Sequence, residues 1–469
     1  AKEKYGLLGN NLNQQLQKPL KIVIEYPAPN TNKPLHLGHV RNMLIGSTLA
    51  NLLRYLGHQV FEVNLYNDRG VHVCKSMLAY KKCGKGAQPG KIKSDHFVGD
   101  FYVKYAELEK ENKDVEEELR NLLKAWEEND PEARELWKKL NKWALDGFKE
   151  TFEKFEIHFD KEYHESEFYE KGKELILKGL EKGIFKKRED GAIIAPLKEK
   201  YNLPDKVLLR ADGTSIYITQ DIYLAYLKKK DFNHDKSIYV VGNEQNLYFK
   251  QLFTILDLLG FKEDKYHLSY GMIYLPEGKM KSREGTVVDA DDIIEKVQEL
   301  VKKELQSREK LSKIELEKRS LKIALAAIKY MLLKVDVKKD MMFNPKESIN
   351  FEGDTGPYLV YTYARASSIL RKCNKKEKIL FENLEQKELE LIKKISQFPE
   401  VVVASRRNLN PSLIANYSYQ LAQIFNEFYH TCPVIGSENE LFRLALVKTF
   451  KQVLKNSLNL LGIESIEKM

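Results

Sequence analysis

Two histidines three residues apart give the strongest chemical signal in the sequence. His36 and His39 flank Gly38 in the run His-Leu-Gly-His, directly after the turn-rich segment 27–34. Apolar residues at helical spacing continue from this run to about residue 56, which predicts a helix with both imidazoles on its first turn. Free N–H groups at a helix start favour a phosphate, and a glycine lets a flat group approach the backbone. Alone, such histidines are more often surface residues, but the strand, turn and helix around them favour a nucleotide site.

A second segment, 276–285, is basic and has glycines on both sides. It reads Pro-Glu-Gly-Lys-Met-Lys-Ser-Arg-Glu-Gly and follows a predicted strand. Its cations could stabilise the charge on a departing pyrophosphate, and one well-placed donor of this kind contributes roughly 3 kcal/mol. A basic loop alone is usually solvated surface. Its place in the second half of a predicted sheet favours the catalytic interpretation.

Hydrophobic periodicity predicts an α/β domain followed by an all-helical one. Strand 21–25, helix 36–56 ending at Gly57, and strand 60–65 form a βαβ unit, so a parallel sheet is expected. Further strands are predicted at 237–241 and 267–275 around a helix at 246–259. Between them lie a helical, charge-rich stretch at about 95–185, with a helix starting at Asp130-Pro131, and Asp-Gly turns at 190–191 and 212–213 that suggest hairpins. After about residue 290 the pattern is helical, most clearly at 315–334, 355–372, 411–430 and 440–461.

The charge of the chain is concentrated in its last third. Residues 301–469 carry 29 Lys and Arg against 20 Asp and Glu, which accounts for the whole net charge of +9. A basic domain appended to a neutral one suggests a polyanionic partner, although a solvated lysine-rich surface is an equal alternative. No apolar run is long enough to span a bilayer, and the N-terminus has no signal-peptide core. Four scattered cysteines without a CxxC pair argue for a reducing compartment and against a thiolate zinc site.

Together, the motifs resemble a known family. The runs HLGH and 279–283 resemble the HIGH and KMSKS signatures of class I aminoacyl-tRNA synthetases. The segments 25–39 (EYPAPNTNKPLHLGH), 67–70 (NDRG) and 215–221 (SIYITQD) resemble arginyl-tRNA synthetases, and 353–365 and 453–462 resemble their helical anticodon-binding domain. The similarity extends from about residue 9 to 469. It implies a Rossmann-like parallel-sheet catalytic domain with a helical insertion, then an all-α anticodon-binding domain, and the charging of tRNA(Arg) with L-arginine.

The resemblance also assigns site residues. A guanidinium is always charged and presents a planar fork of donors, so it requires carboxylates placed for bidentate pairing. Two carboxylates and a tyrosine would bind the arginine side chain, and two amides its α-amino and α-carboxylate groups: Glu25, Asp221, Tyr217, Asn30 and Gln245. Catalytic cations and histidines would be Lys33, His36, His39, Lys279 and Arg283. Further ATP contacts would come from Gly38, Gly242, Asn243, Glu244, Met272, Met280, Lys281 and Ser282. Candidate tRNA readers are Tyr358, Tyr361, Arg365, Tyr417, Asn426 and Tyr429, although a place in the core is the commoner explanation for any one of them.

Two departures from the family pattern stand out. The usual second lysine of KMSKS is Ser282, and Lys33, three residues before His36, would compensate for it together with Lys279 and Arg283. Only about 20 residues precede the first strand, so the N-terminal domain that binds the tRNA elbow is expected to be absent.

The expected domains are a catalytic domain at 1–290, with an insertion at roughly 95–235, a helical stem at 291–345 and the anticodon-binding domain at 346–469.

The implied partners are ATP with Mg²⁺, L-arginine and tRNA(Arg), with no structural zinc, no membrane, a cytoplasmic location and a monomeric chain. Rival interpretations are a cysteinyl or glutamyl enzyme, a small nucleotidylyltransferase and a non-catalytic tRNA-binding protein. The scattered cysteines disfavour a cysteinyl enzyme, and the acidic pocket disfavours a glutamyl enzyme. The basic helical domain disfavours a small nucleotidylyltransferase. The retained histidines, Lys279 and the acidic pocket residues disfavour a non-catalytic protein.

Overall fold

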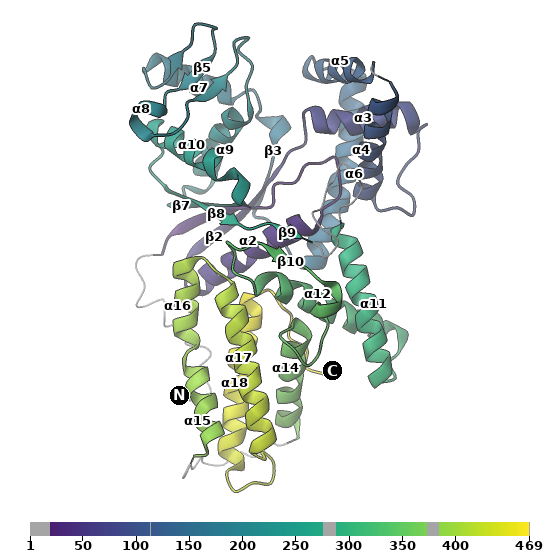
Figure 1. Cartoon of the computed structure of the whole chain (residues 1–469), viewed down its shortest axis with the longest axis vertical. Coiled ribbons are helices and arrows are strands. Elements are labelled where there is room, and N and C mark those ends of the chain that lie inside the picture. The colour runs from purple at the N-terminus through teal and green to yellow at the C-terminus, as the bar shows by residue number, and fades with distance from the viewer. Residues whose placement is uncertain (1–18, 113, 275–287, 373–383, 469) are drawn as a thin grey trace.

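Five parallel strands form the central sheet of the protein. The computed structural model describes residues 19–112, 114–274, 288–372 and 384–468. The strands lie in the order β3-β2-β1-β7-β8, and every neighbouring pair is parallel (Figure 1). Their bounds are β1 Lys21–Glu25, β2 Gln59–Tyr66, β3 Lys161–His164, β7 Lys236–Gly242 and β8 Asp264–Tyr270. The predicted βαβ unit is present as β1, helix α2 (Leu37–Tyr55) and β2.

Helix α2 begins and ends where the sequence indicates. His36 is its N-cap and accepts a hydrogen bond from the backbone of Gly38, which satisfies one of the free donors of the first turn. Gly57 follows the C-terminus with φ of 87°, a conformation that L-residues with a Cβ atom avoid. Apolar side chains all round the helix are buried, because the sheet covers one side and other helices cover the rest.

Residues 67–235, apart from strand β3, form two lobes beyond the carboxyl ends of the strands. One is helical, with α3 (Val71–Cys83), α4 (Ser94–Glu111), α5 (Val115–Glu127) and α6 (Pro131–Phe155), the last capped by Asp130 as predicted. The second contains α7 (Gly172–Glu181), α8 (Lys198–Tyr201), α9 (Tyr217–Phe232) and an antiparallel sheet of β4 (Lys186–Lys187), β5 (Ile193–Ala195) and β6 (Lys206–Leu209). In Figure 1 the lobes stand apart above the central sheet. Gly191 and Gly213 have positive φ at the two predicted Asp-Gly turns.

Strand β3 corrects the sequence analysis, which predicted only helices across residues 95–185. Its residues, Lys161–His164, pair in parallel with Val63–Tyr66 of β2 and form the edge of the central sheet. The strand was missed because four residues at an edge carry too few apolar positions to establish a period of two. It is followed by a short 3₁₀ turn, Glu165–Glu167.

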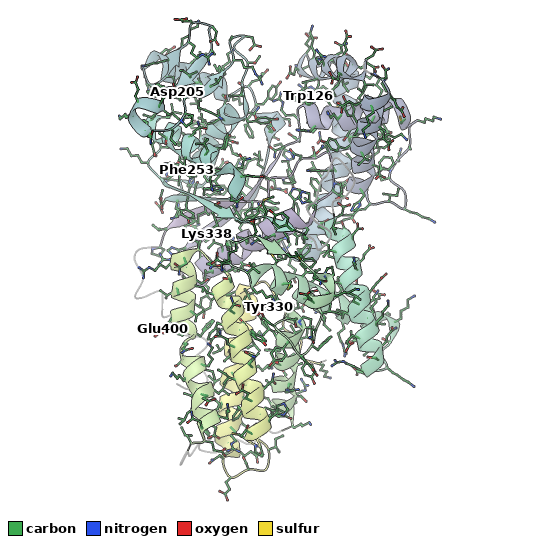
Figure 2. The ribbon with its side chains drawn as sticks, in the orientation of Figure 1. Trp126, Asp205, Phe253, Tyr330, Lys338 and Glu400 are labelled. Carbon is green, nitrogen blue, oxygen red and sulfur yellow. The ribbon has the colours of Figure 1, made fainter. Side chains whose placement is uncertain are left out.

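The helical domain lies on the opposite side of the sheet. Its elements are α11 (Ala290–Arg308), α12 (Lys313–Leu333), α13 (Pro345–Ser348), α14 (Gly356–Arg371), α15 (Gln386–Ser396), α16 (Phe398–Asn408), α17 (Ser412–Thr431) and α18 (Glu440–Leu460). Short strands β9 (Ile273–Tyr274) and β10 (Met341–Met342) pair in parallel at its junction with the sheet. Helix α10 (Asn246–Leu258) contacts β8 on the side of the second lobe, where it packs with α9. One apolar core runs without interruption from the sheet through α2 into α12, α14, α17 and α18. Figure 2 shows Tyr330 of α12 in this core.

Among the described residues, none of the helices combines the length and hydrophobicity needed to cross a bilayer.

Close backbone contact between α12 and α14 supplies the first prediction. A Cβ atom on Gly356, at the start of α14, would lie 2.0 Å from the carbonyl oxygen of Ala326 on α12, and backbone atoms cannot rotate away. Gly356→Ala should therefore destabilise the protein by about 1–3 kcal/mol, as overpacking does. Thermal unfolding tests this against Gly90→Ala, since Gly90 has open space around it. Equal melting temperatures for the two variants would contradict the prediction.

Candidate active site

The order of the strands creates a crevice at the carboxyl end of β1. The chain passes from β1 to β2 on one side, whereas β7 and β8 lie on the other side, so the topology switches between β1 and β7. Ligands of open α/β sheets bind outside the strand ends at such a point. Four elements with predicted site residues meet there: the end of β1, the start of α2, the end of β7 and the β8–β9 connection.

The two histidines lie against each other at the start of α2. Nδ1 of His36 accepts from the backbone N–H of Gly38 at 3.1 Å, and Nδ1 of His39 accepts from the N–H of His36 at 3.2 Å. Their ring centroids are 3.9 Å apart. Because each Nδ1 is an acceptor, the proton of each neutral ring is on Nε2. The motif thus presents two neutral N–H donors, which suits the binding of phosphate oxygens.

Burial keeps both histidines neutral. It lowers the pKa of His36 to about 3, with the charge of Lys33 contributing, and it holds the pKa of His39 well below its ordinary value, with His36 and Lys33 contributing. Lys33 thus adds positive charge near both rings. Its compensation for Ser282 stays a prediction, because Ser282 lies outside the described residues.

Gly38 leaves space that an imidazole ring of the same motif occupies. A Cβ atom at this position would lie 2.9 Å from Cε1 of His36, so the missing side chain makes room for the imidazole that caps the helix. The approach of a flat ligand to the backbone of Gly38 stays a prediction.

The two predicted carboxylates lie in one buried cluster but have different partners. Glu25, at the end of β1, forms an ion pair of 2.6 Å with Lys228 of α9, and both side chains are nearly inaccessible to solvent. Asp221, also on α9, accepts a hydrogen bond from the hydroxyl of Tyr248. Burial raises the pKa of Asp221 to about 6; Glu25 adds to the rise, and Tyr248 and Lys228 oppose it. The charge of Glu25 is thus neutralised within the protein, whereas Asp221 retains an affinity for a further cation.

Sequence reasoning missed three members of this cluster. Lys228 lies over the ring of Tyr239, 3.9 Å from its centroid, and Tyr239 is the register partner of Glu25 across β1 and β7. Tyr248 belongs to α10. Lys228 could have been found, because it follows Asp221 by seven residues and so lies on the same face of a helix. The two tyrosines could not, since the pairing of β1 with β7 brings Tyr239 here and the packing of α10 on α9 brings Tyr248.

The remaining predicted arginine contacts border the crevice. Tyr217 begins α9 and is 68% exposed, one turn before Asp221. It lines a cavity of about 700 Å³ between the two lobes, together with Arg69 and Gln220. Asn30 forms an isolated parallel bridge with Asn67, and Gln245 is exposed in the 3₁₀ turn η3 (Asn243–Gln245) that follows β7. The structure brings Glu25 and Asp221 together, and it leaves Asn30, Tyr217 and Gln245 on separate elements around them.

The predicted ATP contacts occupy the same edge of the sheet. Gly242 ends β7, and Asn243 and Glu244 follow it in η3. Met272 lies in the β8–β9 connection, where its N–H donates to Asp340 and its carbonyl accepts from Met341. Its backbone groups are therefore already paired, so the predicted contact of Met272 with ATP would have to come from its side chain. Lys279, Met280, Lys281, Ser282 and Arg283 lie outside the described residues.

The NDRG run has a structural role that spacing did not reveal. The buried carboxylate of Asp68 accepts from the backbone N–H and the hydroxyl of Ser166, at 2.9 and 2.7 Å, and lies 3.3 Å from Nδ1 of His164. Arg69 lies over the ring of Tyr169 at 4.0 Å and pairs with Glu127 and Glu165. These contacts hold the end of β3 and the helical lobe beside the crevice.

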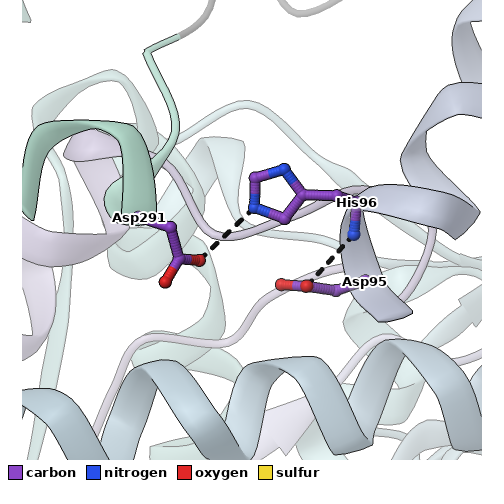
Figure 3. Close-up of side chains that lie close together, drawn as sticks. All are labelled: Asp95, His96 and Asp291. Carbon is purple, nitrogen blue, oxygen red and sulfur yellow. Dashed lines mark hydrogen bonds and ion pairs between the residues drawn. The ribbon is translucent and has the colours of Figure 1, made fainter. Parts of the chain in front are cut away.

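A cluster of Asp95, His96 and Asp291 has the composition of a metal site (Figure 3). Two lysines already neutralise its acidic groups, because Lys93 and Lys154 each lie 2.7 Å from an oxygen of Asp291. They and His96 hold the pKa of Asp291 well below its usual range. The chemistry of this donor set does not fit a cation. The network instead ties the first turn of α11 to α4 and α6.

The same segment is hydrogen-bonded to the histidine motif. The N–H of Leu37 donates to the carbonyl of Val288 at 3.1 Å, and the N–H of Ala290 donates to that of Leu35 at 2.8 Å. The start of α11 therefore has a fixed position beside His36, whose backbone forms a bridge with Asp289.

Five of the six candidate tRNA readers form one cluster on α14 and α17. Arg365 donates to Asn426 and lies 5.0 Å from the ring centroid of Tyr361 and 5.4 Å from that of Tyr429. Asn426 in turn donates to the hydroxyl of Tyr358 at 2.8 Å. Tyr361, Arg365 and Tyr429 line a cavity of about 800 Å³ that also contains Arg319, Arg371 and Lys372.

Tyr417 is not part of that cluster. It is 2% exposed, its hydroxyl donates to the carbonyl of Lys394, and its ring packs on Phe398. The structure therefore places this tyrosine in the core between α15, α16 and α17, out of reach of a ligand. Spacing alone could not distinguish it, because α17 is amphipathic and carries tyrosines on both faces.

Comparison with known proteins gives the family of the chain. The family model described as tRNA synthetases class I (R), catalytic domain, matches residues 5–345, and that of the DALR anticodon binding domain matches residues 359–469. The chain belongs to the arginyl-tRNA synthetases of class I. The arginine–tRNA ligase of Treponema denticola is 48% identical over 96% of this chain and 79% of that protein. The arginine–tRNA ligase of Phocaeicola vulgatus is 45% identical over 100% of this chain and 83% of that protein.

Solved arginyl-tRNA synthetases share the fold. The enzyme of Thermus thermophilus superposes with a TM-score of 0.85 at 24% identity and covers 98% of this chain and 86% of that one. The enzyme of Plasmodium falciparum gives a TM-score of 0.80 at 23% identity, over 98% and 79%. The Rossmann-type parallel sheet and the all-helical domain predicted from the sequence are therefore confirmed.

The buried Glu25–Lys228 pair of this arginyl-tRNA synthetase yields a stability prediction. Lys228→Met removes the cation and leaves Glu25 charged and desolvated, a change that costs about 3–5 kcal/mol when one partner of a buried pair is lost. The comparison variant is Lys236→Met, because Lys236 pairs with the exposed Asp264 and its loss should cost less than about 1 kcal/mol. Chemical denaturation followed by circular dichroism measures both. Similar midpoints would show that the buried pair contributes little.

Proposed function

We propose that this chain activates L-arginine with ATP and transfers the arginyl group to the 3′ end of tRNA(Arg). The observation that carries the proposal is the carboxylate of Asp221, half-buried on α9 beside the neutralised Glu25, with its pKa raised by desolvation to about 6. A desolvated carboxylate gains most from a ligand that brings a permanent positive charge, and a guanidinium is such a ligand. Membership of the arginyl-tRNA synthetases supports the same assignment.

In the first step the arginine carboxylate attacks the α-phosphorus of Mg²⁺-ATP, and pyrophosphate leaves. His36 and His39 donate neutral N–H groups to the phosphates, and Lys33 supplies positive charge beside them. Lys279 and Arg283 are proposed to act on the leaving pyrophosphate, and Met280, Lys281 and Ser282 to line the ATP. Gly242, Asn243, Glu244 and the side chain of Met272 are proposed to hold the adenosine. Such catalysis rests on positioning and on charge stabilisation.

Arginine is proposed to bind with its guanidinium on Asp221 and with Glu25 beside it. Tyr217 would cover the side chain, and Asn30 and Gln245 would hold its α-amino and α-carboxylate groups. In the second step the terminal ribose hydroxyl of the tRNA attacks the carbonyl carbon of the adenylate and AMP leaves. No bond to the enzyme is formed.

The cluster of Tyr358, Tyr361, Arg365, Asn426 and Tyr429 is proposed to read the anticodon loop. Partly exposed aromatic rings and an arginine plane can stack on unpaired bases, and the adjoining basic residues can contact phosphates. We divide the chain into a catalytic domain at 1–290 with an insertion near 95–235, a stem at 291–345 and an anticodon-binding domain at 346–469.

The proposed working form is a monomer in the cytoplasm. The free thiols of Cys74, Cys83 and Cys432 are consistent with that reducing compartment.

The proposed activity is tested by ATP–pyrophosphate exchange with each of the twenty amino acids, with and without tRNA. Exchange should require arginine, and in this family it is expected to require tRNA as well. Asp221→Asn should lower kcat/KM for arginine by at least about 100-fold, because a charged ligand then meets no charge, whereas Asp264→Asn on the exposed edge should leave it unchanged. Exchange driven by another amino acid would refute the arginine pocket and keep the class I core.

The affinity for arginine should depend on pH through Asp221. Its pKa in the free protein is about 6, so it is mainly ionised at pH 7 and protonated below pH 6. The guanidinium favours the ionised form, and binding at low pH must therefore expel a proton. The Kd for arginine should rise about tenfold per pH unit below pH 6 and level off above pH 7. Equilibrium dialysis with labelled arginine measures this, and Asp221→Asn should bind weakly at every pH. A Kd that is constant from pH 7.5 to 5 would exclude Asp221 as the carboxylate that binds the guanidinium of arginine.

A further inference from the structure

A single buried arginine links the histidine helix to two distant segments. Arg41 lies on α2, two residues after His39, and is fully inaccessible to solvent. Its Nη1 donates to the carbonyls of Gly271 and Met272, at 2.5 and 3.1 Å. Its Nη2 donates to the carbonyl of Lys339 at 2.9 Å and lies 3.5 Å from that of Asp336. One guanidinium therefore holds the β8–β9 connection and the turn that follows α12.

The two segments also hold each other. The N–H of Gly271 donates to the carbonyl of Val337 at 2.9 Å, and the N–H of Met272 donates to Asp340 at 2.7 Å. A Cβ atom on Gly271 would lie 2.3 Å from the carbonyl carbon of Lys339, so this residue has to be glycine. The two backbones are packed too closely to shift independently. A change at Arg41 must therefore move the β8–β9 connection, the turn after α12, or both.

The second segment is in turn bound to the helical domain. Asn410, in the turn between α16 and α17, donates to the carboxylate of Asp336 at 2.7 Å. Figure 2 places Lys338 of the same turn where the sheet meets the helical domain. A continuous series of hydrogen bonds thus runs from Asn410 through Asp336 and Arg41 to Met272.

A buried guanidinium without a carboxylate partner is a costly way to hold a fold together. Among the described residues, Arg41 takes part in no ion pair, and burial lowers its pKa to about 10. Apolar residues of similar volume often stabilise a core at least as well as buried charges do. A planar fork of donors offers something that apolar residues lack, because it sets the relative position of several carbonyl groups.

We propose that Arg41 is a positioning residue for ATP: it fixes the β8–β9 connection, and with it Met272, relative to the histidine pair on α2. This inference rests on the proposed function, because it takes Met272 and the two histidines as ATP contacts. Arg41 itself lies under the site and touches backbone carbonyls. Its effect on the reaction is therefore indirect and should be specific for the nucleotide.

The test compares Arg41→Lys with Arg443→Lys. A lysine keeps the charge at position 41, but its single ammonium cannot reach the carbonyls of both segments. Arg443 is the matched control, because it is also buried and multiply bonded, to Glu385, Glu388 and the carbonyl of Pro433, but lies in the helical domain away from α2. In exchange assays with arginine and tRNA, Arg41→Lys should raise the KM for ATP about tenfold or more and change the KM for arginine less than about twofold. Arg443→Lys should change neither KM.

Hydrogen–deuterium exchange of the full chain supplies a readout that does not depend on activity. Amides of residues 270–274 and 336–343 should exchange faster in Arg41→Lys than in the unaltered protein, and those in Arg443→Lys should not. Unchanged exchange in these segments would overturn the proposal, as would a loss of activity in Arg41→Lys that merely follows its folded fraction. If the unaltered protein lacked arginine-dependent activity, the proposed function would fail, and the exchange comparison would still decide whether Arg41 sets the position of the β8–β9 connection.

Discussion

The enclosure of helix α2 is the constraint on which the rest of the structure depends. The sheet covers one side of the helix, and α12, α16 and α18 cover the other, so that apolar residues all round it enter a single core. A helix held on all sides cannot tilt or slide. Its N-terminus therefore keeps His36 and His39 in one place relative to the strand ends, and its interior carries Arg41 to the carbonyls that border the same crevice.

The site divides its electrostatic work between neutral and charged groups. The histidines are desolvated and stay neutral, so they offer donors to a polyanion without adding a proton equilibrium near pH 7. The acidic cluster works in the opposite way, because Lys228 neutralises Glu25 and leaves Asp221 as the carboxylate with unused affinity for a cation. The same low-dielectric surroundings produce both effects, since burial disfavours the charged form of each group.

The two ends of the molecule are connected through packed elements. The start of α11 is bonded to the histidine motif and, through Asp291, to Lys93 and Lys154 of the helical lobe. The turn after α12 is bonded to Asn410 of the helical domain and to Arg41 of α2. Helices α14 and α17, which carry the proposed anticodon readers, contribute buried residues to the same continuous core as α2. This arrangement gives a physical route by which the position of the helical domain can affect the edge of the sheet that is proposed to bind ATP.

The sequence by itself determined the elements, their order and the chemistry of the main motifs. Helix α2, the hairpins at the Asp-Gly turns and the four strong C-terminal helices follow from local periodicity, capping and turn residues, which act over a few positions along the chain. Tertiary structure alone decided which polar groups are paired. It brings Lys228 to Glu25, Tyr248 to Asp221, and Arg41 to the carbonyls of Met272 and Lys339. It also placed β3 at the sheet edge and Tyr417 in the core. The physical reason is that pairing β1 with β7 joins segments more than 200 residues apart, and no local pattern records which side chains will face each other across such a contact.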